Sequence, residues 1–172
     1  MKQAKASGDT ELADLITLGM WTGARIEELC SLKVASVDLK ALAFAVTDAK
    51  TRAGVREVPI HPELLPTLKR LIGKRKDGYV LADLTANKFG DRSNAIGKRF
   101  GRLKTDAGYG PEYVFHSIRK TVVTLLENAG VSENVAADIV GHEKPRITYG
   151  LYSEGATLEV KRAALAKLKY PA

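Results

Sequence analysis

The chain has little cysteine and no long apolar stretch. Cys30 is its only cysteine, so no disulfide can form within the chain, and with only three histidines present a Cys/His zinc site is not expected. No apolar run approaches the length of a membrane-spanning helix. Residues 1–9 are polar and have no apolar segment typical of a signal peptide. These absences favour a cytoplasmic protein without a membrane span.

The composition is that of one globular domain with a basic surplus. The 172 residues are 45% hydrophobic and 27% charged, which is enough to build a buried core. The net charge of +7 favours a polyanionic partner, and nucleic acid is the usual one. Many basic domains simply have a solvated basic surface, so charge alone leaves both interpretations open.

Apolar spacing predicts a mainly helical domain. A helix is expected from Thr10 to Met20, with Asp9 or Thr10 as its cap, after a loose segment over residues 1–9. Thr22-Gly23 breaks this helix, and a short helix with Ile26, Leu29 and Cys30 follows. Further helices are expected near residues 64–71, 93–104, 118–129, 133–140 (capped by Ser132) and 157–169.

Residues 37–60 have a different pattern. Phe44 and Val46 alternate with small residues, as do Val58 and Ile60, and a turn at 51–54 separates the two runs. This pattern predicts a β-hairpin, with a third strand near 37–39. The expected fold class is therefore α+β, mainly α-helical with a small three-stranded antiparallel sheet.

Several short motifs contain residues suited to anion binding, proton transfer or nucleophilic attack. Arg25 follows a glycine break at a helix start, where a guanidinium can add a bidentate contact to an anion, and Glu28 lies three residues on. His116 and Arg119 share a helix face, and His142 follows the glycine that ends a helix. Tyr152 is a possible nucleophile once a base takes its proton. Each feature alone is more often structural, as a surface salt bridge, a satisfied histidine or a packed tyrosine.

Taken in order, these motifs resemble the catalytic domain of the tyrosine recombinase, or phage integrase, family. The matching stretches are TGARIEEL, AKTRAGVREVPI, HSIRK, VGH and ITYGLYS, and they extend across essentially the whole chain. The resemblance implies the tyrosine-recombinase catalytic fold and site-specific recombination of double-stranded DNA. We expect a phage or mobile-element integrase that acts in the cytoplasm of a bacterial or phage-infected cell.

The resemblance implies which residues bind the scissile phosphate. Arg25 and Arg119 would hold it and stabilise the charge of the transition state. His142 would hydrogen-bond a non-bridging phosphate oxygen, and Glu28 would have a supporting role.

The resemblance also implies how the bond is cut and remade. Tyr152 would attack phosphorus and form a 3′-phosphotyrosyl bond, while His116 would assist proton transfer to or from Tyr152. Lys50, at the hairpin turn, would protonate the departing 5′ oxygen. A partner strand's 5′ hydroxyl would reverse the step, so neither ATP nor a metal ion nor another cofactor is expected. Tyr149 is the alternative nucleophile, and Tyr152 is preferred because its neighbours and its distance from His142 match the family better.

The resemblance raises expectations about domains and partners. Residues 1–172 would be a catalytic domain without the family's upstream core-binding and arm-binding domains, as in a truncated chain. DNA affinity would then be weak and strongly salt-dependent. The C-terminal helix, with Leu158, Leu165 and Leu168, would dock on a neighbour in a DNA-bound homotetramer or fold back in cis, and the isolated chain would be a monomer. Basic side chains near one helix are candidate DNA contacts: Lys98, Arg99, Arg102 and Lys104.

Other interpretations remain open at this point. Residues 118–140 have the outline of a helix-turn-helix, which would make the chain a non-catalytic DNA-binding module. The acidic start of its second helix and the apolar Val135, Ile139 and Val140 argue against that. A type IB topoisomerase would use the same tyrosine chemistry to relax supercoils. An inactive prophage remnant or a basic domain without activity would leave the motifs unused.

Overall fold

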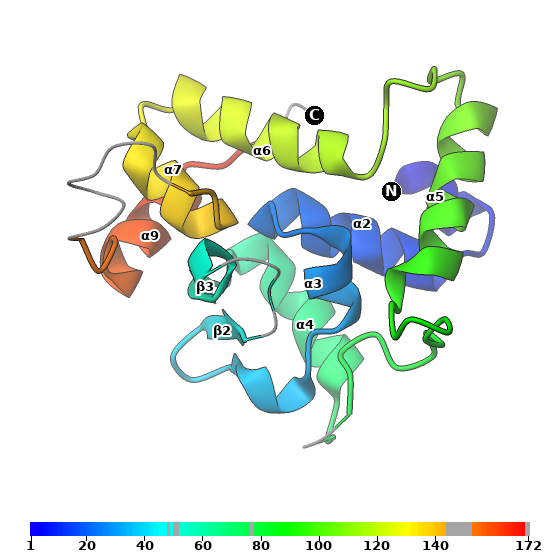
Figure 1. The fold of residues 1–172 in the computed structure, drawn as a ribbon, viewed down its shortest axis with the longest axis horizontal. Coiled ribbons are helices and arrows are strands. Elements are labelled where there is room, and N and C mark those ends of the chain that lie inside the picture. The colour runs from blue at the N-terminus through cyan, green and yellow to red at the C-terminus, as the bar shows by residue number, and fades with distance from the viewer. Residues whose placement is uncertain (48, 50–51, 76–77, 144–152, 171–172) are drawn as a thin grey trace.

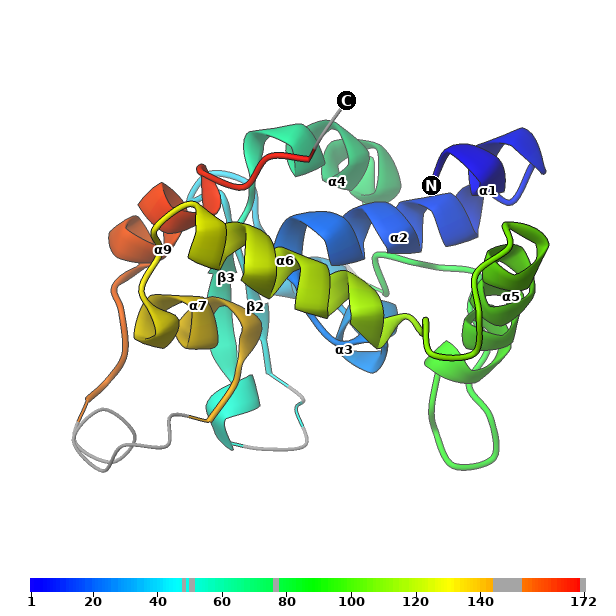
Figure 2. The ribbon, with the colours of Figure 1, turned by 90° about the horizontal axis from the view of Figure 1, so that it is seen from above.

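The computed structural model describes residues 1–47, 49, 52–75, 78–143 and 153–170. Helix α2 (Thr10–Thr22) runs through the middle of the molecule, and α6 (His116–Asn128) packs along it (Figures 1 and 2). The other α-helices among the described residues are α1 (Lys2–Ala6), α3 (Ile26–Cys30), α4 (Leu65–Ile72), α5 (Ser93–Asp106), α7 (Glu133–Val140) and α9 (Leu158–Leu165). The fold class expected from the sequence is confirmed.

Helix α2 has defined signals at both ends. The Asp9 carboxylate accepts a hydrogen bond from the Leu12 amide at 3.1 Å, which caps the first turn. Gly23 ends the helix in a left-handed conformation with φ 62°. The segment before α2 differs from expectation: residues 2–6 form α1 and Ala4 is buried, because its side chain joins the core cluster around α2.

The sheet has three antiparallel strands in the order β1-β2-β3: β1 (Val37–Asp38), β2 (Ala43–Val46) and β3 (Arg56–Pro59). Phe44 pairs with Val37 on one side and with Val58 on the other. A 3₁₀ turn, Arg52–Gly54, precedes β3. After the sheet, Pro62 starts the 3₁₀ turn that leads into α4.

Two apolar clusters form the core. The larger one contains buried side chains from α2, the sheet, α4 and the inward side of α5. The smaller one lies among α6, α7 and α9. Ile139 and Val140 of α7 are fully buried in the smaller cluster. Helix α7 therefore packs its apolar face into the core, and nothing in this packing favours a helix-turn-helix over α6–α7. Ser132 is the residue before α7, but its side chain makes no capping hydrogen bond.

The C-terminal helix folds back on its own domain. Helix α9 packs against α7 and β3, with Leu165 and Leu168 buried. The ammonium of Lys161 donates to the Glu57 carbonyl at 2.7 Å, and the Tyr170 hydroxyl donates to the Met20 carbonyl. Of the two dockings left open by the sequence, the described structure has the one in cis.

Candidate active site

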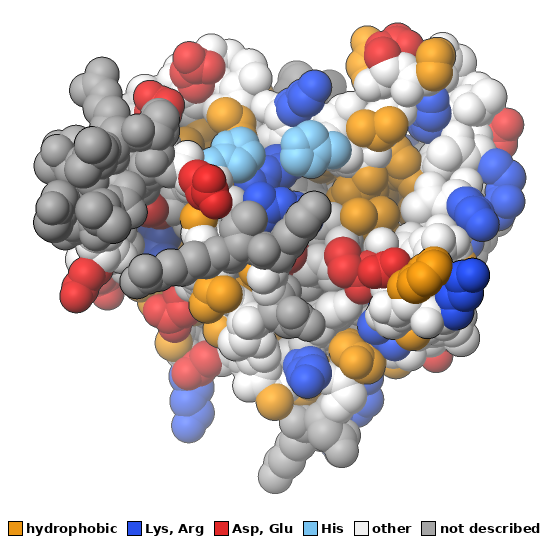
Figure 3. Space-filling view, viewed as in Figure 1, with side chains coloured by type: hydrophobic (Ala, Val, Ile, Leu, Met, Phe, Trp, Pro, Cys, Tyr) orange, Lys and Arg blue, Asp and Glu red, His pale blue; other side chains and the backbone are white. Residues whose placement is uncertain are grey.

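Two arginines and two histidines from three segments meet beside the end of α7. Arg25 is the residue before α3, His116 begins α6, Arg119 lies one turn further on, and His142 follows α7. Figure 3 shows two histidine side chains next to each other, with basic side chains beside them, near the centre of one face. We call Arg25, His116, Arg119 and His142 the arginine–histidine cluster.

Arg25 is held by the carboxylate of Glu28. The Arg25 amide donates to Oε2 at 2.9 Å and its Nη1 donates to Oε1 at 2.7 Å, so the carboxylate of Glu28 in α3 binds both the backbone and the side chain of the residue before the helix. The Glu28 side chain is only 4% exposed, whereas that of Arg25 is 33% exposed. The pair is therefore no surface salt bridge. A buried carboxylate fixes a guanidinium that still reaches solvent.

Arg119 is buried, with 2% exposure, and one of its nitrogens lacks a partner. Its Nη1 donates to the carbonyls of Gly23 (2.9 Å) and Val140, and its Nε donates to Nε2 of His142 at 3.2 Å. Nη2 is also buried but meets no acceptor among the described residues. Because a buried donor without a partner is costly, this nitrogen marks a place for an anion.

Three arginines donate hydrogen bonds to the carbonyls at the C-terminal end of α7. Each of three successive carbonyl groups accepts a hydrogen bond from a different guanidinium: Ile139 from Arg56 (2.8 Å), Val140 from Arg119, and Gly141 from Arg25 (3.2 Å). The C-terminal end of a helix carries partial negative charge, which favours cations there. The end of α7 therefore fixes how the basic groups are placed around His142.

Arg56 is a site residue that the sequence analysis did not single out. It begins β3, its side chain is 5% exposed, and it also donates to Glu28 Oε2 at 3.0 Å. It lies in the stretch Arg-Glu-Val-Pro-Ile that carried the family resemblance, but nothing local indicates that it points toward α3 and α7. Gly141 leaves room for it, since a Cβ there would lie 2.6 Å from its Nη1.

Positive charge exceeds negative charge at the cluster. Burial, followed by the charges of Arg25 and Arg56, lowers the pKa of Arg119 to about 10, which still leaves it cationic at neutral pH. Burial alone would raise the pKa of Glu28, but hydrogen bonds from Arg56 and Arg25 hold it below its usual value. One carboxylate thus faces three guanidiniums, an imbalance that an incoming phosphate would correct.

Both histidines of the cluster are held in the neutral form. Partial burial and then the charge of Arg119 lower the pKa of His116 and the pKa of His142, although both side chains reach solvent. Since Nε2 of His142 accepts a hydrogen bond from Arg119, its proton must reside on Nδ1. Neutral imidazoles can accept or pass on a proton near physiological pH.

Lys50, Tyr149 and Tyr152 lie outside the described residues. The chain is described again from Ser153, and the Ala156 amide donates to Asp138 Oδ2 at 2.8 Å. Asp138 is on α7, so the segment just after Tyr152 is attached to the same helix whose end holds the arginines.

The four basic residues expected to contact DNA differ in their surroundings. All are on α5, where Lys98 and Arg102 are exposed. The guanidinium of Arg99, in contrast, forms ion pairs with Asp9 and Glu11, and Lys104 donates to the Gly110 carbonyl. The charge of Arg99 is therefore largely compensated within the chain.

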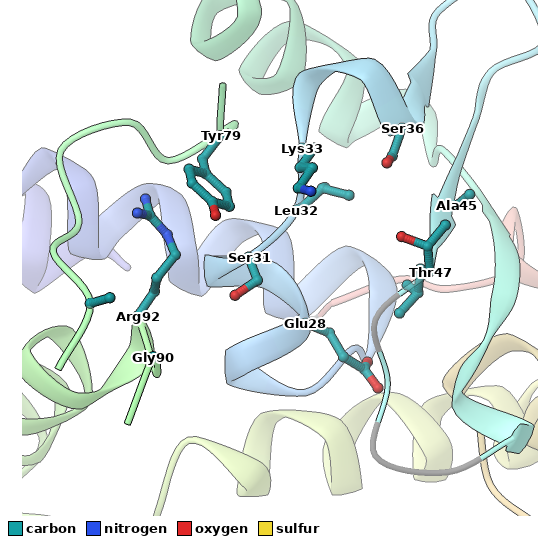
Figure 4. A pocket seen from close by; sticks show the side chains of 12 residues that line it. Glu28, Ser31, Leu32, Lys33, Ser36, Ala45, Thr47, Tyr79, Gly90 and Arg92 are labelled. Carbon is teal, nitrogen blue, oxygen red and sulfur yellow. The ribbon is translucent and has the colours of Figure 1, made fainter. Parts of the chain in front are cut away.

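Two hollows adjoin the site. One, of about 220 Å³, opens beside Glu28 between α3 and β2, and hydroxyl and basic side chains line it, among them Ser31, Lys33 and Thr47 (Figure 4). The other, of about 350 Å³, lies between α6 and α7 and includes His142.

Over the residues that the structure describes, no three His, Cys, Asp or Glu side chains are grouped to hold a metal ion. In the same part of the chain, no helix has the length and apolar character to cross a membrane.

Comparison with known proteins identifies the family. The model of the phage integrase family matches residues 1–158. A tyrosine recombinase XerC-like protein of Caldanaerobacter subterraneus is 26% identical, with 83% of this chain and 45% of that protein covered. The transposase of transposon Tn916 from Enterococcus faecalis is 24% identical, with 87% and 44% covered. The chain thus spans about half the length of the curated relatives it matches.

Solved structures agree with this assignment. The integrase of mycobacterium phage Brujita superposes with a TM-score of 0.71 at 17% identity, covering 92% of this chain and 52% of that one, which is a likeness of fold. The Tn1549 transposon integrase, solved in complex with circular intermediate DNA, has a TM-score of 0.61 at 25% identity, with 95% and 66% covered. The chain therefore belongs to the phage integrase family of tyrosine recombinases.

Proposed function

We propose that this chain is the catalytic domain of a site-specific DNA recombinase of the phage or mobile-element type. It cleaves and rejoins double-stranded DNA through a 3′-phosphotyrosyl link to Tyr152, with neither a metal ion nor ATP. The observation that carries the proposal is the buried Nη2 of Arg119, which has no partner among the described residues and lies next to Arg25 and His142. A phosphate diester supplies the negative charge and the acceptor oxygens that this arrangement lacks.

The described residues provide the phosphate site. Arg119 and Arg25 bind the non-bridging oxygens, and their charges stabilise the additional negative charge of the pentacoordinate transition state. His142 donates from Nδ1 to one of these oxygens. Because the guanidiniums are fixed by carbonyls and by Glu28 before DNA arrives, little reorganisation is needed during the reaction.

The remaining steps are assigned through the family motifs. The hydroxyl oxygen of Tyr152 attacks phosphorus, the bond to the 5′ oxygen breaks, and Lys50 gives that oxygen its proton. His116, neutral at physiological pH, takes up the tyrosine proton or returns it. The 5′ hydroxyl of a partner strand then displaces Tyr152, so the number of phosphodiester bonds is unchanged.

DNA and further protomers are the proposed partners. The Tn1549 integrase was solved on transposon DNA, which supports double-stranded DNA as the substrate. A homotetramer on DNA is proposed, and use of α9 between protomers would require the helix to leave its place on α7 and β3. The free chain is proposed to be a monomer in the cytoplasm of a bacterial or phage-infected cell, with DNA affinity that depends strongly on salt.

Covalent capture tests the proposal. The chain is incubated with a library of duplexes of randomised sequence, each carrying a nick that lets the cleaved end diffuse away. Protein–DNA adducts are isolated under denaturing conditions and sequenced. Adducts are expected from the parent and from Tyr149→Phe but not from Tyr152→Phe. Loss in Tyr149→Phe alone would move the nucleophile to Tyr149. Absence of adducts even after an upstream DNA-binding domain of a relative is fused to the chain would overturn the proposed function.

A further inference from the structure

We propose that Arg56 is a positioning residue of the recombination site, which aligns the arginine–histidine cluster by joining Glu28 to the end of α7. The inference rests on the proposed function. Arg56 touches none of the reacting atoms in this proposal. It acts through Arg25, which shares its carboxylate partner, and through the helix end that carries His142.

The first link is to Arg25. Glu28 Oε2 accepts from both the Arg25 amide (2.9 Å) and Nη2 of Arg56 (3.0 Å), while Oε1 accepts from Nη1 of Arg25. Glu28 and Arg56 are both nearly inaccessible, with side chains 4% and 5% exposed. Without Arg56 the carboxylate would lose one of its two cations in a buried setting, and its orientation toward Arg25 would be less defined.

The second link is to α7. Nε of Arg56 donates to the Ile139 carbonyl at 2.8 Å, and the two carbonyls that follow hold Arg119 and Arg25. Its Nη1 donates to the Gly54 carbonyl at 2.6 Å, which ties the turn before β3 to the same guanidinium. One planar group thus bridges β3, α3 and α7, which are far apart in the sequence.

Only the planar fork of an arginine can make these contacts together. Nε, Nη1 and Nη2 each donate in a different, fixed direction to Ile139, Gly54 and Glu28. A lysine would keep the charge but concentrates its donors on one nitrogen. Arg56→Lys therefore separates geometry from charge, and Arg56→Met removes both.

The test compares cleavage of two substrates. Single-turnover cleavage is measured at saturating DNA on a captured duplex and on the same duplex with a methylphosphonate at the scissile position. The methyl group removes one negative charge, so the reaction depends less on how the guanidiniums are aligned. On the phosphate, Arg56→Met is expected to cleave ~10²-fold more slowly, since misplacement of about 1 Å costs that much. Arg56→Lys is expected to be slow as well, with DNA affinity little changed in both. On the methylphosphonate, both deficits are expected to shrink.

The controls make each outcome informative. Arg92 is also buried and donates to two carbonyls, those of Cys30 (2.9 Å) and Leu81 (2.7 Å), but it bonds to no member of the cluster. Any deficit of Arg92→Met should be equal on the two substrates. Full activity of Arg56→Lys would reduce the role of Arg56 to its charge, and equal Arg56 deficits on both substrates would reduce it to general stability. Either result would overturn the inference. Absence of adducts from the parent, both alone and fused to the upstream DNA-binding domain, would instead overturn the proposed function.

Discussion

At the scale of single residues, the site is defined by how few of its charges are balanced. Arg119 is almost completely buried, yet its bonds are to neutral carbonyls and to a neutral imidazole. Carbonyl dipoles fix the direction of a guanidinium without cancelling its charge, so the charge stays available for an anion. Glu28 differs, because it compensates Arg25 and Arg56 and holds them in place.

The histidines predict how stability depends on pH. The pKa values of His61, His116 and His142 are all lowered in the folded chain, with burial as the first cause. Between the folded values and the unfolded value of about 6.5, the unfolded chain binds more protons. The free energy of unfolding is therefore expected to fall as pH decreases from 7.5 to 5.5, which urea titrations at several pH values would measure.

A second variant locates part of this pH effect at the site. Replacing His142 with Gln is expected to flatten the slope between pH 7.5 and 5.5, because one proton-binding difference is removed. The carboxylates with lowered pKa values act only at lower pH, below about 4.5; they are Asp9, Glu27, Glu28, Asp38 and Glu159. Stability that rises on acidification over the histidine range would contradict the assignment.

At the scale of elements, helix ends do most of the positioning. Arg25 directly precedes α3, α6 begins with His116, and α7 ends at the carbonyls that hold three arginines. Gly23 closes α2 where α6 and α7 meet, and its carbonyl accepts from Arg119. Close approach of backbones at this junction depends on the absence of a side chain at Gly23.

Two glycines that end helices provide a matched comparison. Gly23 (φ 62°) and Gly130 (φ 72°), which follows α6, both have positive φ, but only at Gly23 would a Cβ meet neighbours, with Val140 at 2.8 Å and Val122 at 3.1 Å. Gly130→Ala is expected to lower the free energy of unfolding by ~1 kcal/mol from backbone strain alone. Gly23→Ala is expected to cost a further ~1–3 kcal/mol from overpacking. Chemical denaturation of both variants measures the difference, and equal losses would show that the junction is not crowded.

At the scale of the whole molecule, only part of the basic charge can attract an anion, because the rest is paired within the chain. The net charge is +7, but part of it is paired within the chain, as at Arg99 and Arg70. The arginine–histidine cluster and the exposed side of α5 retain positive charge that is not paired in this way. Nonspecific attraction to DNA follows the unpaired charge rather than the total.

DNA binding at several salt concentrations tests this distinction. Lys98→Ala is expected to weaken binding about equally for all sequences and to reduce the slope of log K against log salt by about 1, as for one lost phosphate contact. Arg99→Ala is expected to reduce the slope less, because Asp9 and Glu11 already hold its guanidinium. A larger slope change for Arg99→Ala than for Lys98→Ala would show that the ion pairs open on DNA.

The sequence by itself determined the fold class, several of the helix ends and the family. Apolar periodicity and glycine placement depend on local geometry, so Gly23, Gly141 and the hairpin were predictable. Arg25, His116, Arg119 and His142 could be singled out as candidates because their motifs are local as well, and the structure brings them together. Only the tertiary structure decided that Arg56 joins them, that Arg99 is paired, that residues 2–6 form a helix and that α9 docks in cis. Each of these depends on contacts between segments far apart in the chain, whose directions no local pattern encodes.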